Sequence, residues 1–165
     1  MFSDFSYIKF FVVMENPLGI DKKEAEETIS ILKLILSDEF VLYVKARNYH
    51  WNVVGINFVE LHKFFEKIYE EINEFIDDIA ERIRTLGGYP PSTLREFLEL
   101  AEIKEHPGVY PPPQTMIKNL LYDHELIIRK IRENVDRVDA GTADLLTEIL
   151  RSHEKTAWIL RSLLE

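Results

Sequence analysis

The 165-residue chain contains no cysteine. This absence excludes disulfide bonds, thiolate metal sites and cysteine nucleophiles, and it leaves histidine and carboxylate side chains as the available metal ligands. The chain also lacks any run of about 18 apolar residues, so the sequence predicts no membrane-spanning helix. Internal repeats and low-complexity linkers are missing too, and the length suits one domain with a sizeable core.

Positive charge is scarce as well. The formal net charge is -9, because 29 acidic residues outnumber 20 Lys and Arg residues. Phosphate contacts require clustered cations and no basic tail is visible, so we expect DNA binding to be weak or absent. The following cations are scattered, and we predict that they are solubilising surface charge: Lys22, Lys23, Lys45, Arg47 and Arg84.

The first fourteen residues are apolar and aromatic. They lack a basic leader and a small-residue cleavage site, so a signal peptide is a poor fit and we expect a cytoplasmic protein. Two interpretations stay open: translation starts at Met14, or the segment is a real extension that packs on an assembly. We therefore divide the chain into an N-terminal extension, residues 1–20, and one domain, residues 21–165.

Hydrophobic periodicity predicts an all-α protein. Apolar residues recur at steps of three and four over two long segments, 22–50 and 58–86, and helices are also expected over 114–138 and 143–165. Asp21 is the expected cap of the first helix, and Gly141-Thr142 is the expected break before the last. A short helix over 93–101, capped by Ser92, is predicted inside the long middle connection. This order favours a four-helix bundle with an extra short helix in the crossover.

Four potential metal ligands lie on the second predicted helix. His62 and Glu66 are four residues apart, as are Asp77 and Glu81, so each pair shares one helical face. The eleven residues from Glu66 to Asp77 correspond to roughly 16 Å along the axis. One ion cannot contact both pairs, so each pair is half of a site.

A second copy of the helix resolves this separation. If it ran antiparallel about a two-fold axis between Glu71 and Ile72, His62 would meet Glu81 of the partner subunit, and Glu66 would meet Asp77. Both pairs of residue numbers sum to 143. An isologous dimer would then complete two identical sites.

Taken singly, each pair has an ordinary explanation. An acidic pair at this spacing is more often a solvated or salt-bridged helix face, and His62 with Glu66 is also compatible with a surface hydrogen bond. The complementary register, together with His50 at the end of the preceding helix, favours a metal site. Imidazole nitrogens and carboxylate oxygens are the donors that such a site would offer to a divalent transition metal.

A longer motif resembles the Dps family, the mini-ferritins named as DNA-binding proteins from starved cells. The resemblance is carried by Asn48-Tyr49-His50-Trp51-Asn52-Val53, Gly55, Asn57-Phe58, Leu61-His62, Phe65-Glu66, Asp77, Ala80-Glu81-Arg82 and Leu86-Gly87-Gly88. It implies a ferritin-like bundle, a hollow dodecamer built from two-fold dimers, oxidation of Fe(II), usually by hydrogen peroxide, and storage of ferric mineral.

The resemblance also assigns residues. It implies that one subunit supplies His50, His62 and Glu66 to each ferroxidase site and that its partner supplies Asp77 and Glu81. At position 66 many family members carry Asp, so Glu66 keeps an oxygen ligand on a longer side chain. Trp51 is expected beside the site without binding the metal.

Further residues carry weaker signals. The resemblance aligns Asp139, Asp144 and Glu148 with an acidic pore through which iron enters, although acids at a helix start are also ordinary dipole complements. The remaining histidines show no ligand pattern, and we expect surface or hydrogen-bonded roles for His106, His124 and His153.

Two other classes are considered. Ordinary ferritin-like di-iron bundles place Glu-x-x-His motifs within one chain, and no histidine here has Glu three residues before it. The alternative function is a DNA-protecting or structural shell with little ferroxidase activity. Aerobic Fe(II) oxidation separates that shell from an enzyme.

Overall fold

A computed structural model describes residues 18–165, and its regular elements are all helical, as predicted. In chain order they are α1 (Lys22–Asn52), α2 (Phe58–Thr85), α3 (Leu94–Leu100), α4 (Pro113–Asn134), the short 3-10 helix η1 (Val135–Arg137) and α5 (Ala140–Ser162). The predicted N-terminal extension, with the question of a start at Met14, falls mainly on residues outside the described part.

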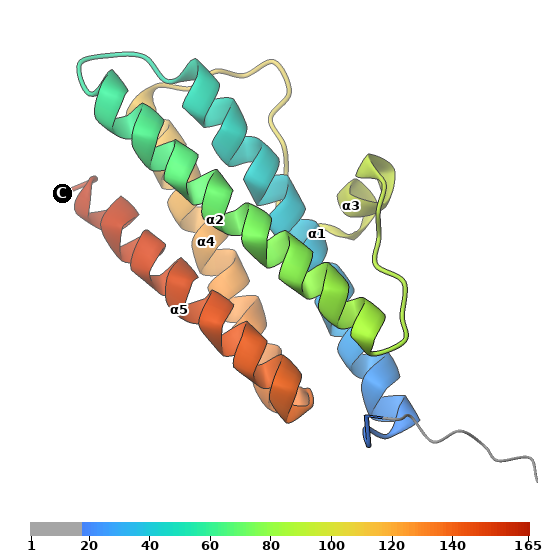
Figure 1. The fold of residues 1–165 in the computed structure, drawn as a ribbon. Coiled ribbons are helices and arrows are strands. Elements are labelled where there is room, and N and C mark those ends of the chain that lie inside the picture. Colours follow the sequence, from blue (N-terminus) through green and yellow to red (C-terminus); the bar gives the residue numbers. More distant parts are fainter. Residues whose placement is uncertain (1–17) are drawn as a thin grey trace, which may run out of the picture.

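The bundle consists of two helical hairpins. α1 packs along α2, α4 packs along α5, and α1 also contacts α4, so the four long helices enclose one core (Figure 1). The connection from α2 to α4 crosses the bundle and carries a short helix, as the sequence predicts, and this helix, α3, packs against α1. Among the described helices, none combines the length and apolar character needed to cross a membrane.

Side-chain caps and a glycine set two helix ends near their predicted positions. Asp21 accepts hydrogen bonds from the backbone N–H groups of Lys23 and Glu24, which confirms it as the cap of α1. At the end of α2, Gly87 has a φ of 89°. This conformation lets the Gly88 N–H donate to the carbonyl of Ile83 at 2.9 Å and closes the helix.

Two predicted boundaries are wrong. The cap of α3 is Thr93, not Ser92, because Thr93 and Glu96 form a reciprocal capping box. The last helix begins at Ala140, so Gly141 and Thr142 lie in its first turn instead of breaking the chain. Asp139 stabilises that turn by accepting from both of their backbone N–H groups.

The apolar face of α2 faces the core as its periodicity predicts. Phe65 and Ile79 are fully buried, whereas Asp77 and Glu81 are exposed on another face of the same helix. Burying one such large apolar side chain contributes about 1.5–3 kcal/mol. Core packing therefore fixes the rotation of α2 and keeps its acidic pair outside the bundle.

A buried ion pair joins α1 to α4. Lys45 Nζ lies 2.5 Å from Asp123 Oδ2, and both side chains are almost completely buried. The prediction that Lys45 is solubilising surface charge is therefore wrong. Burial raises the pKa of Asp123, and the neighbouring Lys45 only partly opposes that effect.

We predict that Lys45→Met destabilises the protein by about 3–5 kcal/mol, because Asp123 would be left buried without its cation. The double variant Lys45→Met/Asp123→Leu should recover most of that loss. Lys22→Met is the control, since Lys22 is exposed and its removal should change the free energy of unfolding by less than about 1 kcal/mol. Chemical denaturation measures all three, and equal effects of the single and double variants would contradict the prediction.

Candidate metal centre

His50 and His62 are brought together where α1 ends and α2 begins. Their rings stack with centroids 3.7 Å apart. His50 Nδ1 lies 2.8 Å from the carbonyl oxygen of His62, and His62 Nδ1 lies 2.8 Å from the carbonyl oxygen of His50. A carbonyl oxygen only accepts, so each Nδ1 carries the proton and donates it.

These reciprocal bonds determine what the rings offer to a metal. With Nδ1 protonated, the lone pair of each neutral imidazole is on Nε2. Histidines that bind metals ordinarily donate the other ring N–H to a carbonyl or carboxylate, which holds the ring in place. His50 and His62 therefore have the tautomer and the fixed orientation that a pair of nitrogen ligands requires.

Glu66 lies one helical turn beyond His62, and a tyrosine links it to the histidine pair. The Tyr69 hydroxyl donates to Glu66 Oε1 at 3.4 Å, and the Tyr69 ring is edge-on to His50 with centroids 5.3 Å apart. Burial, followed by the nearby Glu66 and Glu70 carboxylates, raises the pKa of Tyr69. The phenol thus stays protonated, and its hydroxyl group orients Glu66 by donating a hydrogen bond to the carboxylate.

Asp77 and Glu81 lie farther along α2, on its exposed surface. At 1.5 Å per residue, Asp77 is roughly 16 Å along the axis from Glu66. Within residues 18–165 of one chain, no three His, Asp or Glu side chains are grouped so as to hold a metal ion. The single chain therefore presents His50 with His62 at one end of α2 and the acidic pair at the other, and the two-fold register stays a prediction.

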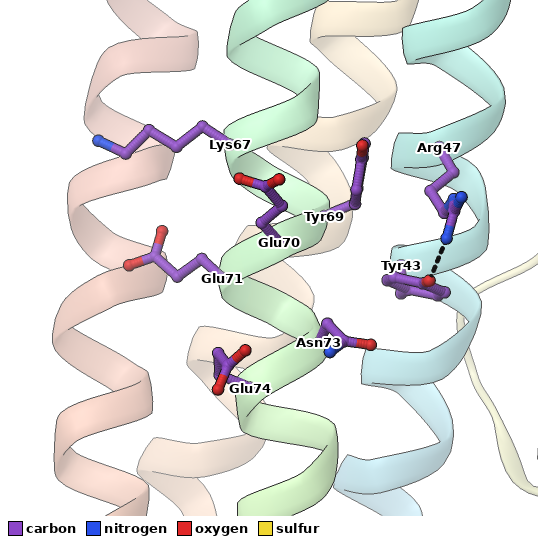
Figure 2. A pocket seen from close by; sticks show the side chains of 8 residues that line it. All are labelled: Tyr43, Arg47, Lys67, Tyr69, Glu70, Glu71, Asn73 and Glu74. Carbon is purple, nitrogen blue, oxygen red and sulfur yellow. Dashed lines mark hydrogen bonds between the residues drawn. The ribbon is translucent and has the colours of Figure 1, made fainter.

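A groove of about 600 Å³ lies between these two ends (Figure 2). Figure 2 shows Tyr43 and Arg47 extending from α1, with Tyr69 on the neighbouring side of α2. The α2 residues that line the groove fall between Lys67 and Glu74, a segment that includes the predicted two-fold centre at Glu71 and Ile72.

Arg47 is the central side chain of an aromatic cluster at this groove. Its Nη1 donates to the Tyr43 hydroxyl at 2.5 Å, and its guanidinium lies 5.0 Å from the Tyr69 ring and 5.1 Å from the Trp51 ring. Such contacts are favourable cation–π interactions. The prediction of a purely solubilising Arg47 is therefore wrong.

Trp51 is 65% exposed in the single chain, although it directly follows His50. Its ring contacts the Arg47 guanidinium, and its role next to a metal stays a prediction. Other exposed apolar side chains are close to it in sequence, including Ile56, which is 99% exposed.

The three predicted pore residues differ in their surroundings. Asp139 is occupied by structural contacts, since it caps α5 and lies 2.6 Å from Arg82 Nη2. Burial would raise the pKa of Asp139, but hydrogen bonds from Thr142 and Gly141 and the charge of Arg82 outweigh it and lower the pKa. Asp144 and Glu148 are exposed. The pore itself stays a prediction.

Tyr69 and Arg47 are the two residues near the site that the motifs do not identify. A weak signal for Tyr69 is its spacing, three residues after Glu66 and seven after His62, which puts it on the ligand face of the helix. For Arg47 no comparable signal exists, because its aromatic partners come from two helices.

Known proteins share this fold. A family model for the ferritin-like domain matches residues 29–165. A Dps protein from Bacillus brevis has a TM-score of 0.84 and 35% identity, over 88% of this chain and 100% of that one. DNA protection during starvation protein 2 of Bacillus anthracis is 35% identical over 144 residues, which are 84% of this chain and 97% of the relative.

The chain belongs to the Dps family. This membership confirms the family and the fold that the motif predicts, and it puts the chain among the iron-storage mini-ferritins in general. The Dps protein of Vibrio cholerae O1, a member of the ferritin-like diiron-carboxylate superfamily, has a TM-score of 0.87 and 31% identity, over 90% of this chain and 96% of that one. An uncharacterized low temperature-induced protein of Nostoc sp. is 46% identical over 153 residues, 90% of this chain and 86% of the relative.

We predict that Asp139→Ala lowers the free energy of unfolding by about 1–2 kcal/mol near neutral pH, because α5 loses its N-cap. The pKa of Asp139 is lowered in the folded state, so its stabilisation is present above the unfolded value of about 3.9 and is lost as the pH falls through the folded value. The effect of the variant should therefore shrink in strong acid.

Asp144→Ala is the matched control on the same helix, and its effect should stay within about 0.5 kcal/mol because Asp144 is exposed. Denaturant unfolding at several pH values measures both variants. Equal effects of the two substitutions would show that Asp139 has no special role in stabilising α5.

Proposed function

We propose that this Dps-family protein is a ferroxidase that oxidises Fe(II) at sites shared between two subunits and stores the ferric product in a hollow shell. The observation that carries the proposal is the reciprocal hydrogen bonding of His50 and His62 beside Glu66. It gives two oriented imidazole nitrogens and one oriented carboxylate on one side of a site. Iron is the substrate here, and it is also the stored product.

The second subunit supplies the missing oxygen ligands. In the antiparallel register about Glu71 and Ile72, Asp77 and Glu81 of the partner subunit approach Glu66 and His62. Exposed carboxylates suit this role because they need no rearrangement of the core to meet a partner. The groove on α2 and the exposed apolar side chains near Trp51 support a subunit contact at the same face.

The resulting ligand set fits ferrous iron. Imidazole nitrogens and carboxylate oxygens bind Fe(II), and five protein ligands shared among the bound ions leave positions open for an oxidant. We propose hydrogen peroxide as that oxidant. Two Fe(II) ions each give one electron, the O–O bond breaks, and two protons complete two water molecules.

The residues of the chain have distinct roles in this scheme. His50 and His62 bind through Nε2, and their Nδ1–H bonds keep both rings fixed while the charge of the iron changes. Tyr69 holds Glu66 through its hydroxyl. Trp51 and Arg47 shield the histidine pair from solvent once the partner subunit covers the groove.

The shell is proposed to be a cytoplasmic dodecamer of two-fold dimers, with iron entry past Asp144, Glu148 and Asp139. The dodecamer rests on family membership, because the register reaches only a dimer. Because Asp139 is paired with Arg82, the exposed Asp144 and Glu148 are the stronger candidates for attracting cations. Stress protection, which the names of several relatives express, would follow from removing Fe(II) and peroxide together.

A complementation experiment tests the shared site. His62→Ala/Glu66→Ala subunits and Asp77→Ala/Glu81→Ala subunits should each be inactive alone. When they are assembled together, every mixed dimer regains one complete site. Random pairing gives mixed dimers in about half of the total, hence roughly a quarter of the wild-type sites.

Activity is measured as Fe(II) oxidation after peroxide addition, and native mass spectrometry confirms the mixed dimers. The matched control mixes His62→Ala with Glu66→Ala subunits. Both changes fall in the same half-site, so every site in a mixed dimer still lacks one ligand and no activity should be regained. No recovery in confirmed mixed dimers would mean that the two half-sites do not meet.

The alternative function, DNA protection by direct binding, predicts a different result. We expect no gel shift of duplex DNA at physiological salt with chelator present, since the net charge of -9 opposes phosphate contacts. Chelation is needed because a divalent ion would bridge acidic protein and phosphate. A strong shift under these conditions would favour a shell that protects DNA by coating it.

A further inference from the structure

Three ionisable side chains meet in the middle of the bundle, away from the metal half-sites. Glu39 on α1, His124 on α4 and His153 on α5 are each at most 2% exposed. His153 Nε2 lies 2.8 Å from Glu39 Oε1, and His153 Nδ1 lies 2.7 Å from His124 Nδ1. The histidines are hydrogen-bonded, one of the two expected outcomes, but they join three helices in the core.

The hydrogen bonds constrain the protons of this network. Two facing ring nitrogens need one proton between them, and a carboxylate needs a donor on the ring nitrogen beside it. A Glu39 carboxylate with two neutral imidazoles satisfies both contacts. That arrangement, however, leaves a net negative charge in an apolar core, which is strongly unfavourable.

Within residues 18–165, Glu39 forms an ion pair only with His153, and no Lys or Arg pairs with it. On the surrounding helices, Asp38 pairs with Lys130, Asp123 with Lys45, and Glu154 with Arg132. From α2 the network meets the Phe75 ring, 5.9 Å from His153, while Glu71 accepts a hydrogen bond from Ser152. Neutrality must therefore come from a proton.

We propose that Glu39, His153 and His124 form a buried proton-binding site that holds one proton beyond a carboxylate and two neutral imidazoles. The hydrogen-bonded chain ends at Glu39 Oε2 on one side and at His124 Nε2 on the other. Both atoms are buried and have no hydrogen-bond partner in the described structure. Loss of the proton would put a negative charge in the core, and a second proton would put a positive charge there. The neutral state links α1, α4 and α5.

The site makes stability depend on pH in both directions. Above about pH 6.5 the unfolded imidazoles are neutral, so unfolding releases the bound proton and stability falls as the pH rises. Below about pH 6.5 the unfolded chain binds two protons at these histidines and the folded chain holds one, so stability falls as the pH decreases. On either side of about pH 6.5, the unfolding equilibrium constant changes about tenfold per pH unit.

The loss of stability below about pH 6.5 is consistent with the environment of His124. Burial, together with the neighbouring His153, lowers the pKa of His124 well below its usual range. A base with a lowered pKa binds its proton only after unfolding, so it destabilises the fold as the pH falls below the unfolded value. The contribution of this site to stability is thus greatest near the pH at which free imidazole titrates.

Glu39→Gln tests the site with little change of shape. The amide removes the negative charge, so the folded variant needs no additional proton. We compare the folding equilibrium constant of Glu39→Gln with that of the wild type. The ratio of variant to wild type should rise about tenfold per pH unit from pH 5 to pH 8, and contributions from other groups cancel in it. A ratio that does not change with pH would overturn the proposal.

His124→Leu has a different signature and provides an independent check. The ratio of its folding equilibrium constant to that of the wild type should rise about tenfold per pH unit as the pH falls below 6.5 and should be constant above pH 6.5. The control His106→Gln removes an exposed imidazole that takes no part in the network, so its ratio should not follow the His124→Leu pattern. Chemical denaturation of the full chain at fixed protein concentration measures all ratios. A flat His124→Leu ratio, or an equal slope in the control, would refute assignment to the core.

Discussion

The separation of two ligand pairs on one rigid helix is the constraint on which the proposed function depends. α2 is continuous from Phe58 to Thr85, and its buried face is fixed by the core. His62 with Glu66 therefore cannot approach Asp77 with Glu81, which lie roughly 16 Å farther along. Any site that uses both pairs must be formed by two chains, so the proposed iron chemistry requires assembly.

Hydrogen bonds within the single chain already hold the side chains of one half of the proposed site in place. The turn after α1 brings the His50 and His62 backbones close enough for each ring to bond the other residue's carbonyl. The His50 carbonyl lies in the last turn of α1, where carbonyls lack helical partners, whereas the His62 carbonyl lies inside α2. Tyr69 then ties Glu66 to the same cluster. Because these ligands are already held in place, little free energy is needed to rearrange them when a cation binds.

Much of the fold was predictable because it depends on local rules. The spacing of apolar residues on α2 identifies its buried face, and the Asp21 cap and Gly87 identify helix ends. The failures are instead non-local. Lys45 looks like surface charge because its partner, Asp123, is 78 residues away. His124 and His153 form a contact that no periodicity encodes, since their relative depth is set by how α4 and α5 pack.

The most direct test of the shared ferroxidase site is an anaerobic Fe(II) titration followed by hydrogen peroxide, with absorbance and particle mass recorded in separated oligomer fractions. The account predicts that Fe(II) binds and is oxidised rapidly in fractions that contain two-fold dimers or larger shells, and that dissociated single subunits are inactive. Single subunits that oxidise Fe(II) as fast as the assembled protein would contradict it.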